Sequence, residues 1–142
     1  HVTGSAWVVS DDRTRVLLTH HRKLDRWLQL GGHADGDPDL FAVALREARE
    51  ESGLASFAAH PAGEPPVPLD VDVHTIPARS GEPAHLHHDL RFLLVARPGQ
   101  PLRVSEESHA LRWVPWHELP ALSEEESLLR MARYAQEALG LG

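Results

Sequence analysis

Short apolar and alternating segments recur along this chain, and their spacing predicts a series of strands. Runs that are apolar or that alternate apolar with polar residues are typical of strands. They occupy residues 4–10, 15–19, 27–30, 69–76, 85–95 and 111–114. A polar turn at 11–14 joins the first two segments, which we therefore expect to form a hairpin. Ser80-Gly81 lies between the fourth and fifth, which predicts a second antiparallel hairpin.

A first helix is predicted over residues 38–52, where the apolar spacing changes to that of a helix. Asp37 is a good N-cap, and Pro38 suits the first helical position. Gly53 stands where a helix commonly ends in a left-handed residue. We therefore expect this helix to start at Pro38 and to stop at Gly53.

A second helix is predicted near the end of the chain. Ser123 and Glu126 have the spacing of a capping box, and an apolar stripe continues to about Leu139. The chain has 142 residues without an internal repeat or a linker, which suits one domain over residues 1–142. Strands mixed with two main helices favour an α/β fold, with a sheet covered by helices on its faces.

Composition narrows the possible functions. The formal net charge of −7 argues against a nucleic acid or an anionic membrane as partner. The chain has no cysteine, which excludes disulfides, thiolate metal sites and a cysteine nucleophile. No apolar run approaches the roughly 18 residues of a membrane helix. We expect a cytoplasmic protein.

Three glutamates on the first predicted helix are the main candidates for chemistry. Glu47, Glu50 and Glu51 are spaced i, i+3, i+4, so a helix places them on one face. Like charges repel there unless a cation lies among them, and Mg²⁺ prefers such hard oxygen ligands. The alternative is a solvated helix face on which Arg46 and Arg49 pair with the glutamates.

The segment 32–54 resembles the Nudix box, G-x5-E-x7-R-E-U-x-E-E-x-G-U, where U is a bulky aliphatic residue. The positions that match are Gly32, Arg46, Glu47, Glu50, Glu51, Gly53 and Leu54, with Ala48 as a small version of the first U. At a frequency of about 7% per residue type, six fixed positions agree by chance about once in ten million starts. The resemblance implies a Nudix α/β/α sandwich with a mixed β-sheet.

The resemblance also implies an activity and roles for the box residues. The expected activity is divalent-metal-dependent hydrolysis of a diphosphate linkage in a nucleoside diphosphate linked to another moiety. Glu50 and Glu51 would be the principal ligands of Mg²⁺, or of Mn²⁺. Glu47 would be a further ligand or the base that orients water, and the carbonyl of Gly31 would complete the coordination. Arg46 would hold Glu47 in place and is counted with the three glutamates as catalytic.

One box position departs from the family pattern. The glutamate that usually stands eight residues before the box arginine is Pro38 in this chain. In the family this glutamate mainly supports the arginine. Asp37 and Asp39 flank the gap and are candidates to replace it, while Asp37 and Pro38 also serve as a helix start. The departure concerns the support of Arg46 more than the metal site.

Two glutamates outside the box are candidates for a loop base. Many family members take a catalytic base from a loop, and Glu106 and Glu107 lie in such a segment here. The alternative is that both are exposed loop residues without a catalytic role.

Histidines and charged residues alternate on the two strands of the second predicted hairpin. The chain has 11 histidines. Period two puts each of two sets on a single face of its strand, and pairing would bring both sets to the same side. Three interpretations remain open: substrate contacts, an additional Zn²⁺ or Mn²⁺ site, or a solvated face without a role. The first strand carries Asp70, Asp72 and His74, and the second carries His85, His87, Asp89 and Arg91.

The sequence therefore predicts a Nudix pyrophosphohydrolase acting on a small nucleotide or another diphosphate. A homodimer is possible from family habit. The alternative is a Nudix-fold module that binds a nucleotide or a metal for regulation without turnover, because a fold does not fix a function. The isomerase branch that resembles this fold uses a catalytic cysteine, which the chain lacks.

Overall fold

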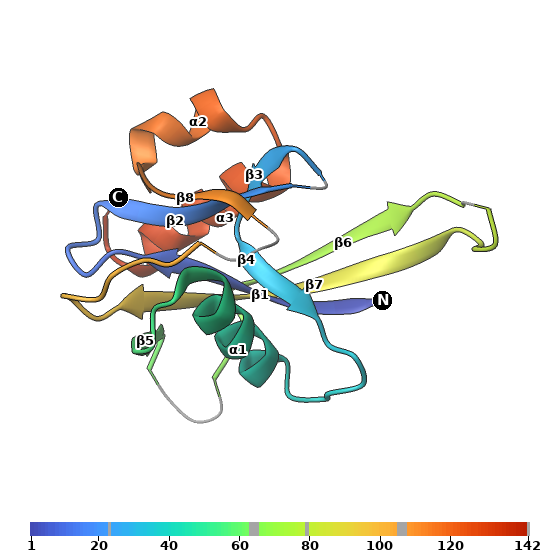
Figure 1. Ribbon diagram of the computed structural model, residues 1–142, viewed down its shortest axis with the longest axis horizontal. Helices are drawn as coiled ribbons and strands as arrows, with labels where there is room; N and C mark the ends of the chain where they lie inside the picture. The colour runs from blue at the N-terminus through green and yellow to red at the C-terminus, as the bar shows by residue number, and fades with distance from the viewer. Residues whose placement is uncertain (23, 63–65, 79, 105–107, 142) are drawn as a thin grey trace.

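A mixed sheet of eight strands forms the centre of the protein (Figure 1). The structure is a computed structural model that describes residues 1–22, 24–62, 66–78, 80–104 and 108–141. Its strands are β1 (Val2–Val9), β2 (Arg15–His21), β3 (Arg26–Leu28), β4 (Leu30–His33), β5 (Phe57–His60), β6 (Asp70–Ile76), β7 (His85–Ala96) and β8 (Ser108–Pro115). Its helices are α1 (Leu40–Ser52), α2 (Leu119–Leu122) and α3 (Glu126–Ala138), with a 3-10 turn at Trp116–Glu118.

Strand β1 organises the sheet, in which the main path runs β3-β2-β1-β7-β5. Strand β1 is parallel to β7 along its whole length and antiparallel to β4 and β2. Strand β8 pairs with β2, and β6 pairs with β7. Both predicted hairpins are therefore confirmed, although β1 and β2 pair only at Val9 and Val16. The parallel pairing joins segments far apart in the chain, so no local pattern predicted it.

Helices cover both faces of the sheet, as the predicted α/β/α sandwich requires (Figure 1). Alternate residues of β1 enter two separate cores, because side chains of a strand alternate between its faces. Trp7 and Val9 pack in the core beneath α3. Ala6 and Val8 pack in the core beneath α1. No helix within the described ranges is long and apolar enough to cross a membrane.

Helix α1 begins two residues later than the sequence predicted. Asp39 is its N-cap, and the Asp39 carboxylate accepts a hydrogen bond from the Ala42 N–H at 3.0 Å. Asp37 instead forms the preceding turn by accepting from the Asp39 N–H at 2.9 Å. The predicted start at Asp37 and Pro38 was therefore wrong. The predicted end is confirmed, because Gly53 has a φ of 77° and donates to the carbonyl of Arg49.

The predicted capping box of the last helix was also wrong. Helix α3 begins at Glu126, and its N-cap residue Glu125 makes no side-chain capping bond. The Ser123 hydroxyl accepts instead from the Glu125 N–H at 3.2 Å, which forms a local turn. The Glu126 carboxylate pairs with Arg133 at 2.7 Å, and this arginine lowers the pKa of Glu126.

Other differences concern the short elements. The predicted strand over 27–30 is two strands, since β3 pairs with β2 and β4 pairs with β1. The predicted strand stopped at Leu30, whereas in the structure Gly31 and Gly32 lie inside β4. Strand β5 and helix α2 were not predicted, because both are only four residues long.

Helix α1 lies unusually close to β1 at Gly4. A Cβ at residue 4 would lie 2.5 Å from the carbonyl oxygen of Leu40 and 3.1 Å from the nitrogen of Ala44. Both contacts are with helix backbone, which cannot rotate away as a side chain can. Only glycine therefore permits this distance between the helix and the sheet, and α1 carries the box glutamates.

Gly4→Ala is expected to push α1 away from β1 and to lower the free energy of unfolding by about 1–3 kcal/mol, the usual cost of overpacking. Urea denaturation measures the loss. Glu137→Ala, an exposed position on α3, is the control and should change stability by less than about 0.5 kcal/mol. Equal stability of the two variants would contradict the close approach.

Candidate functional site

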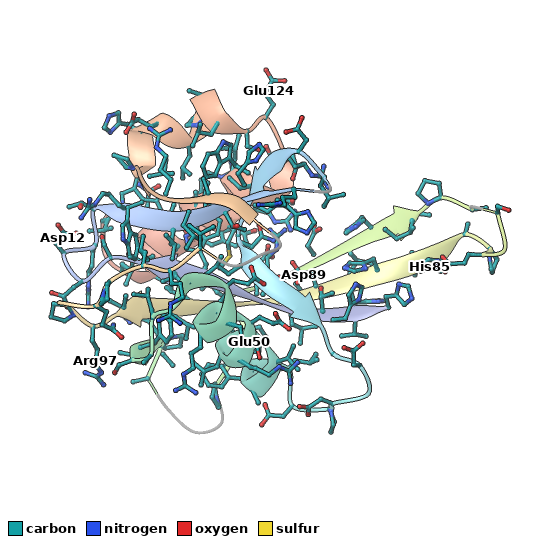
Figure 2. All side chains as sticks on the ribbon, in the orientation of Figure 1. Asp12, Glu50, His85, Asp89, Arg97 and Glu124 are labelled. Carbon is teal, nitrogen blue, oxygen red and sulfur yellow. The ribbon has the colours of Figure 1, made fainter. Side chains whose placement is uncertain are left out.

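Two of the three box glutamates lie against β4. The Glu51 carboxylate accepts a hydrogen bond from the Gly31 N–H at 3.4 Å. Glu47 lies over Gly32, where a Cβ on residue 32 would be 2.6 Å from the carboxyl carbon of Glu47. Glu50 is exposed on the same helix (Figure 2). The face predicted from the i, i+3, i+4 spacing is therefore directed at the two glycines of the box strand.

Glycine at both positions 31 and 32 makes this approach possible. A Cβ at residue 31 would come within 2.8 Å of the Ser5 Cα on the neighbouring strand. A Cβ at residue 32 would collide with the Glu47 carboxylate on the other side. The strand is thus enclosed by β1 and by the acidic face of α1, so its backbone lies next to the carboxylates.

Arg46 lies beside Glu47, with 3.8 Å between Arg46 Nη2 and Glu47 Oε1. The side chains are 44% and 21% exposed, so this ion pair is partly screened by solvent. Of the two aspartates that could replace the missing box glutamate, Asp39 caps the helix and Asp37 forms the turn before it. The proximity of Arg46 to Glu47 agrees with the predicted orienting role, which stays a prediction.

The chemistry of this donor set fits a hard divalent cation. The Glu51 carboxylate lies at Gly31 and the Glu47 carboxylate lies at Gly32, which are adjacent residues of β4. Glu50 lies between these two glutamates in the sequence of α1. Across the part of the chain that the structure describes, however, no three His, Asp or Glu side chains converge as a metal ion requires. A cation would therefore need side-chain rotation, which the exposed Glu50 permits.

The second candidate set lies on the β6–β7 hairpin, and its strands pair as predicted. Asp70 is opposite Arg91, Asp72 is opposite Asp89, and His74 is opposite His87. Since opposite residues of antiparallel strands share a face, the alternating sets form one continuous polar surface. Its inner half lies against α3, and its outer half extends away from the body of the protein (Figure 1).

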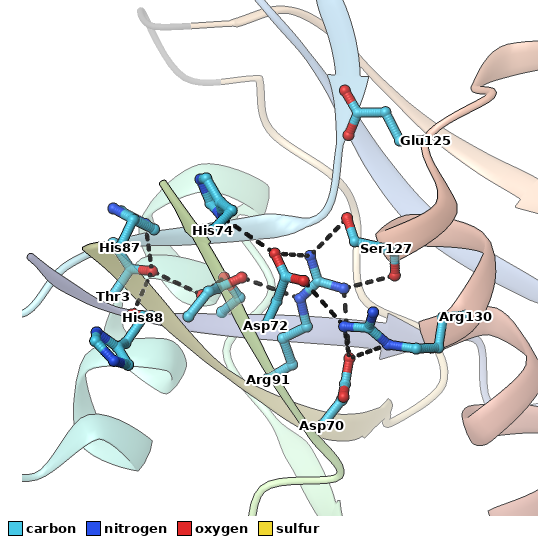
Figure 3. A network of polar contacts seen from close by, with 12 residues as sticks. Thr3, Asp70, Asp72, His74, His87, His88, Arg91, Glu125, Ser127 and Arg130 are labelled. Atoms are coloured by element: carbon cyan, nitrogen blue, oxygen red, sulfur yellow. Dashed lines mark hydrogen bonds and ion pairs between the residues drawn. The ribbon is translucent and has the colours of Figure 1, made fainter. Parts of the chain in front are cut away.

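The inner half is a buried network of ion pairs (Figure 3). Asp89 and Arg91 are 5% and 4% exposed, and Arg91 Nε donates to Asp89 at 3.1 Å. Asp89 also accepts from the hydroxyls of Thr3 at 2.7 Å and Ser5 at 2.5 Å. Arg91 Nη1 donates to the carbonyl of Ser127 on α3 at 2.6 Å. These contacts join the hairpin to both β1 and α3.

Arg130 of α3 completes the network from the helix side. Its guanidinium donates to Asp70 at 2.9 Å and to Asp72 at 3.0 Å. These bonds raise the pKa of Arg130 above its ordinary value. Burial raises the pKa of Asp72, but hydrogen bonding to Arg130 and the charge of Arg91 outweigh it, so the pKa of Asp72 is lowered. Both groups are therefore charged at neutral pH.

The outer half is a histidine cluster, which we define as His1, His33, His74, His85 and His87. The rings of His74 and His87 lie 4.9 Å apart between centroids, and His1 contacts His85 at 4.5 Å. Burial and the neighbouring His74 lower the pKa of His87, so this ring is neutral at pH 7. His85 lies out along the hairpin, whereas Asp89 lies near the body (Figure 2).

The sequence did not predict that His1 and His33 belong to this cluster. His33 ends β4 and pairs with Thr3, while β1 brings the start of the chain beside His88 on β7. The only local signal was the position of His33 directly after the box glycine. The parallel pairing of β1 with β7 was needed to place the other ring.

A cavity of about 530 Å³ lies beside the histidine cluster, at the connection between β4 and α1. It is large enough for a small-molecule group. Its lining residues are His1, Val2, His33, Ala34, Asp35, Gly36, Asp37, Pro38 and Leu40. The proposed loop bases Glu106 and Glu107 lie outside the described residues.

Known proteins resemble this chain over nearly its full length. The model of the NUDIX domain matches residues 1–134. A NUDIX-family hydrolase from Clostridium perfringens is 25% identical with a TM-score of 0.75, covering 99% of this chain and 97% of that one. A C. elegans Ap4A hydrolase in a binary complex is 14% identical with a TM-score of 0.76, covering 98% and 97%.

A third structure is the NUDIX domain of Shewanella oneidensis NrtR complexed with ADP ribose. It is 16% identical with a TM-score of 0.70, covering 97% of this chain and 87% of that one. The second and third similarities concern the fold alone. No curated protein matches the chain significantly.

Arg91→Met is expected to lower the free energy of unfolding by about 3–5 kcal/mol, because it leaves buried carboxylates without their central cation. Arg130→Met is the matched control. Its side chain is 26% exposed against 5% for Arg91, so water can replace part of its contacts. Urea denaturation measures both variants. Equal losses would show that Arg91 is not the centre of the network.

Proposed function

This chain belongs to the NUDIX family of hydrolases, and from that premise we propose that it cleaves a diphosphate linkage in a nucleoside diphosphate joined to another moiety, with Mg²⁺ as cofactor. The family assigns the chain to hydrolases of phosphoric anhydride bonds. Nudix hydrolases generally use divalent metal ions. The substrate class and the choice of Mg²⁺ are parts of the proposal.

The observation that carries the proposal is the position of Glu47 and Glu51 against Gly31 and Gly32. A solvated helix face, the alternative for these glutamates, would leave their carboxylates in water. Instead Glu51 accepts from the backbone of β4, and Glu47 is 21% exposed against Gly32. Acidic side chains packed on a backbone segment form an anionic site that a divalent cation would neutralise.

The proposed ligands are the carboxylates of Glu47, Glu50 and Glu51, with the carbonyl of Gly31. A bound divalent ion would neutralise phosphate oxygens and lower the pKa of a water molecule. Arg46 would restrain Glu47, since its guanidinium lies 3.8 Å from that carboxylate. The peptide N–H of Gly31 fixes one oxygen of Glu51.

The polar face of the β6–β7 hairpin and the cavity beside α1 are the proposed regions for the rest of the substrate. His74 is the most accessible member of the face, with its side chain 50% exposed. Asp89 and Arg91 are buried and bonded within the protein, so their contribution would be to hold this face in place. One structure of the same fold, the NrtR NUDIX domain, is complexed with ADP ribose, which supports a nucleoside diphosphate as the ligand class.

Glu51→Gln is expected to lower kcat by at least about 100-fold, because a neutral amide cannot replace a carboxylate as a metal ligand. Changing a residue that only supports a metal ligand already costs up to about 100-fold in metal affinity or activity. Phosphate or pyrophosphate release is measured over a panel of nucleotides, sugar nucleotides and dinucleotides with Mg²⁺ or Mn²⁺. Glu137→Gln on α3 is the matched control and should keep full activity.

Two outcomes would contradict the proposal. If Glu51→Gln keeps the activity of the unmodified protein, the carboxylate is not a ligand. If the unmodified protein binds Mg²⁺ but cleaves no member of the panel, the regulatory-module alternative is favoured instead.

Gly32→Ala is expected to displace the Glu47 carboxylate by about 1 Å, a misplacement that costs roughly 100-fold in rate. A double-mutant cycle with Glu47→Ala tests whether the loss arises from displacement of Glu47. If the glycine serves only to make room for Glu47, adding Gly32→Ala to Glu47→Ala should cause no further loss. A full additional loss would assign Gly32 a different role.

A further inference from the structure

The histidine cluster contains a triangle of three imidazole rings that are far apart in the sequence. Ring centroids are 5.7 Å apart for His1 and His33, 6.3 Å for His33 and His87, and 6.4 Å for His1 and His87. The planes of each pair are nearly perpendicular, at 83°, 85° and 86°. These rings come from the residue before β1, the end of β4 and the first residues of β7, so the pairing of these strands brings them together.

The triangle is wider than one that a bound metal ion would impose, and among the described residues no three such side chains converge on one ion as they stand. With metal–nitrogen distances of about 2.0–2.1 Å, rings on one tetrahedral ion have centroids about 5 Å apart. The three observed separations exceed this by about 1 Å, a change that side-chain rotation can supply. His1 and His33 are exposed and His87 is half-buried, so the surrounding structure leaves room for that rotation.

A fourth ring lies at ligand distance from the first. His85 Nε2 is 3.1 Å from His1 Nδ1, whereas two nitrogens on one tetrahedral Zn²⁺ are about 3.3 Å apart. Two neutral imidazole nitrogens that face each other share one proton at most. A cation between them would instead use both lone pairs.

Hydrogen bonds on the far side of the rings prepare lone pairs for a metal. His85 Nδ1 lies 3.2 Å from the carbonyl of Pro83, which can only accept, so this nitrogen carries the proton and Nε2 is left as a lone pair. The Thr3 hydroxyl donates to Asp89, so it accepts from His87 Nε2, and His87 Nδ1 keeps its lone pair. Such bonds from the non-ligating nitrogen are the usual support of metal-binding histidines.

We propose that the imidazoles of His1, His33, His85 and His87 form a binding site for a transition-metal ion of the Zn²⁺ class, separate from the carboxylate site on α1. Four nitrogen ligands suit Zn²⁺, whereas the oxygen ligands of the box glutamates suit Mg²⁺. A closed four-ligand site is structural. It would fasten the outer part of the β6–β7 hairpin to β1 and β4, beyond the reach of the buried ion pairs.

Isothermal titration of the full chain with ZnCl₂ in saturating MgCl₂ tests the proposal. The expected result is one Zn²⁺ per chain. The double variant His33→Gln/His87→Gln should lose at least about 100-fold in affinity. Thr3→Val, which removes the hydroxyl that supports His87 and also bonds Asp89, should lose about tenfold. The visible absorption of Co²⁺ in the same site should show tetrahedral coordination, and circular dichroism checks that each variant is folded.

Two controls separate this site from the others. His117→Gln, a histidine at the 3-10 turn, should bind Zn²⁺ as the unmodified protein does. Glu47→Gln/Glu51→Gln should also keep Zn²⁺ binding while losing the response to Mg²⁺. The proposal is overturned if Zn²⁺ does not bind stoichiometrically. It is equally overturned if binding is lost with the glutamate pair and kept without His33 and His87.

Discussion

The contact of helix α1 with glycine backbone on two strands is the constraint on which the site depends. Gly4 lets the first turns of the helix rest on β1, and Gly32 leaves room for the Glu47 carboxylate one strand away. Asp39 and Gly53 determine where the helix begins and ends. Together these contacts fix the height of α1 above the sheet and its rotation, and therefore which carboxylates reach the Gly31-Gly32 segment. The proposed metal site therefore depends on a packing distance as much as on the acidic residues.

A second, electrostatic contact holds the β6–β7 side of the molecule. The β6–β7 hairpin projects beyond the sheet, and its base is joined to α3 through Arg91 and Arg130. Both guanidinium groups meet aspartates on the hairpin, and the arrangement leaves few polar groups of this region without a partner. Breaking a buried ion pair is costly, so these contacts hold the base of the hairpin firmly on the body of the protein. The outer half is held by the pairing of β6 with β7 and by contacts among the histidines.

The sequence predicted the chemistry better than the pairing of the strands. The box spacing identified the helix, its last residue and the acidic face, because these depend on neighbours within four positions. The alternation on 70–76 and 85–91 correctly predicted a shared polar face. Helix starts were less predictable, since Asp37 and Asp39 are equivalent caps until the turn before α1 is known. His1 and His33 join the histidine cluster because β1 lies parallel to β7. This long-range pairing produces no periodic pattern in the sequence.

The enclosure of Glu47 against Gly32 makes the three box glutamates unequal starting points for protein engineering. Glu50 is exposed, so it can be exchanged for other side chains without disturbing the packing. The Glu47 carboxylate lies directly over Gly32, so a larger side chain at position 47 has no room there. Attempts to alter the proposed metal site should therefore start at position 50 and leave position 47 unaltered.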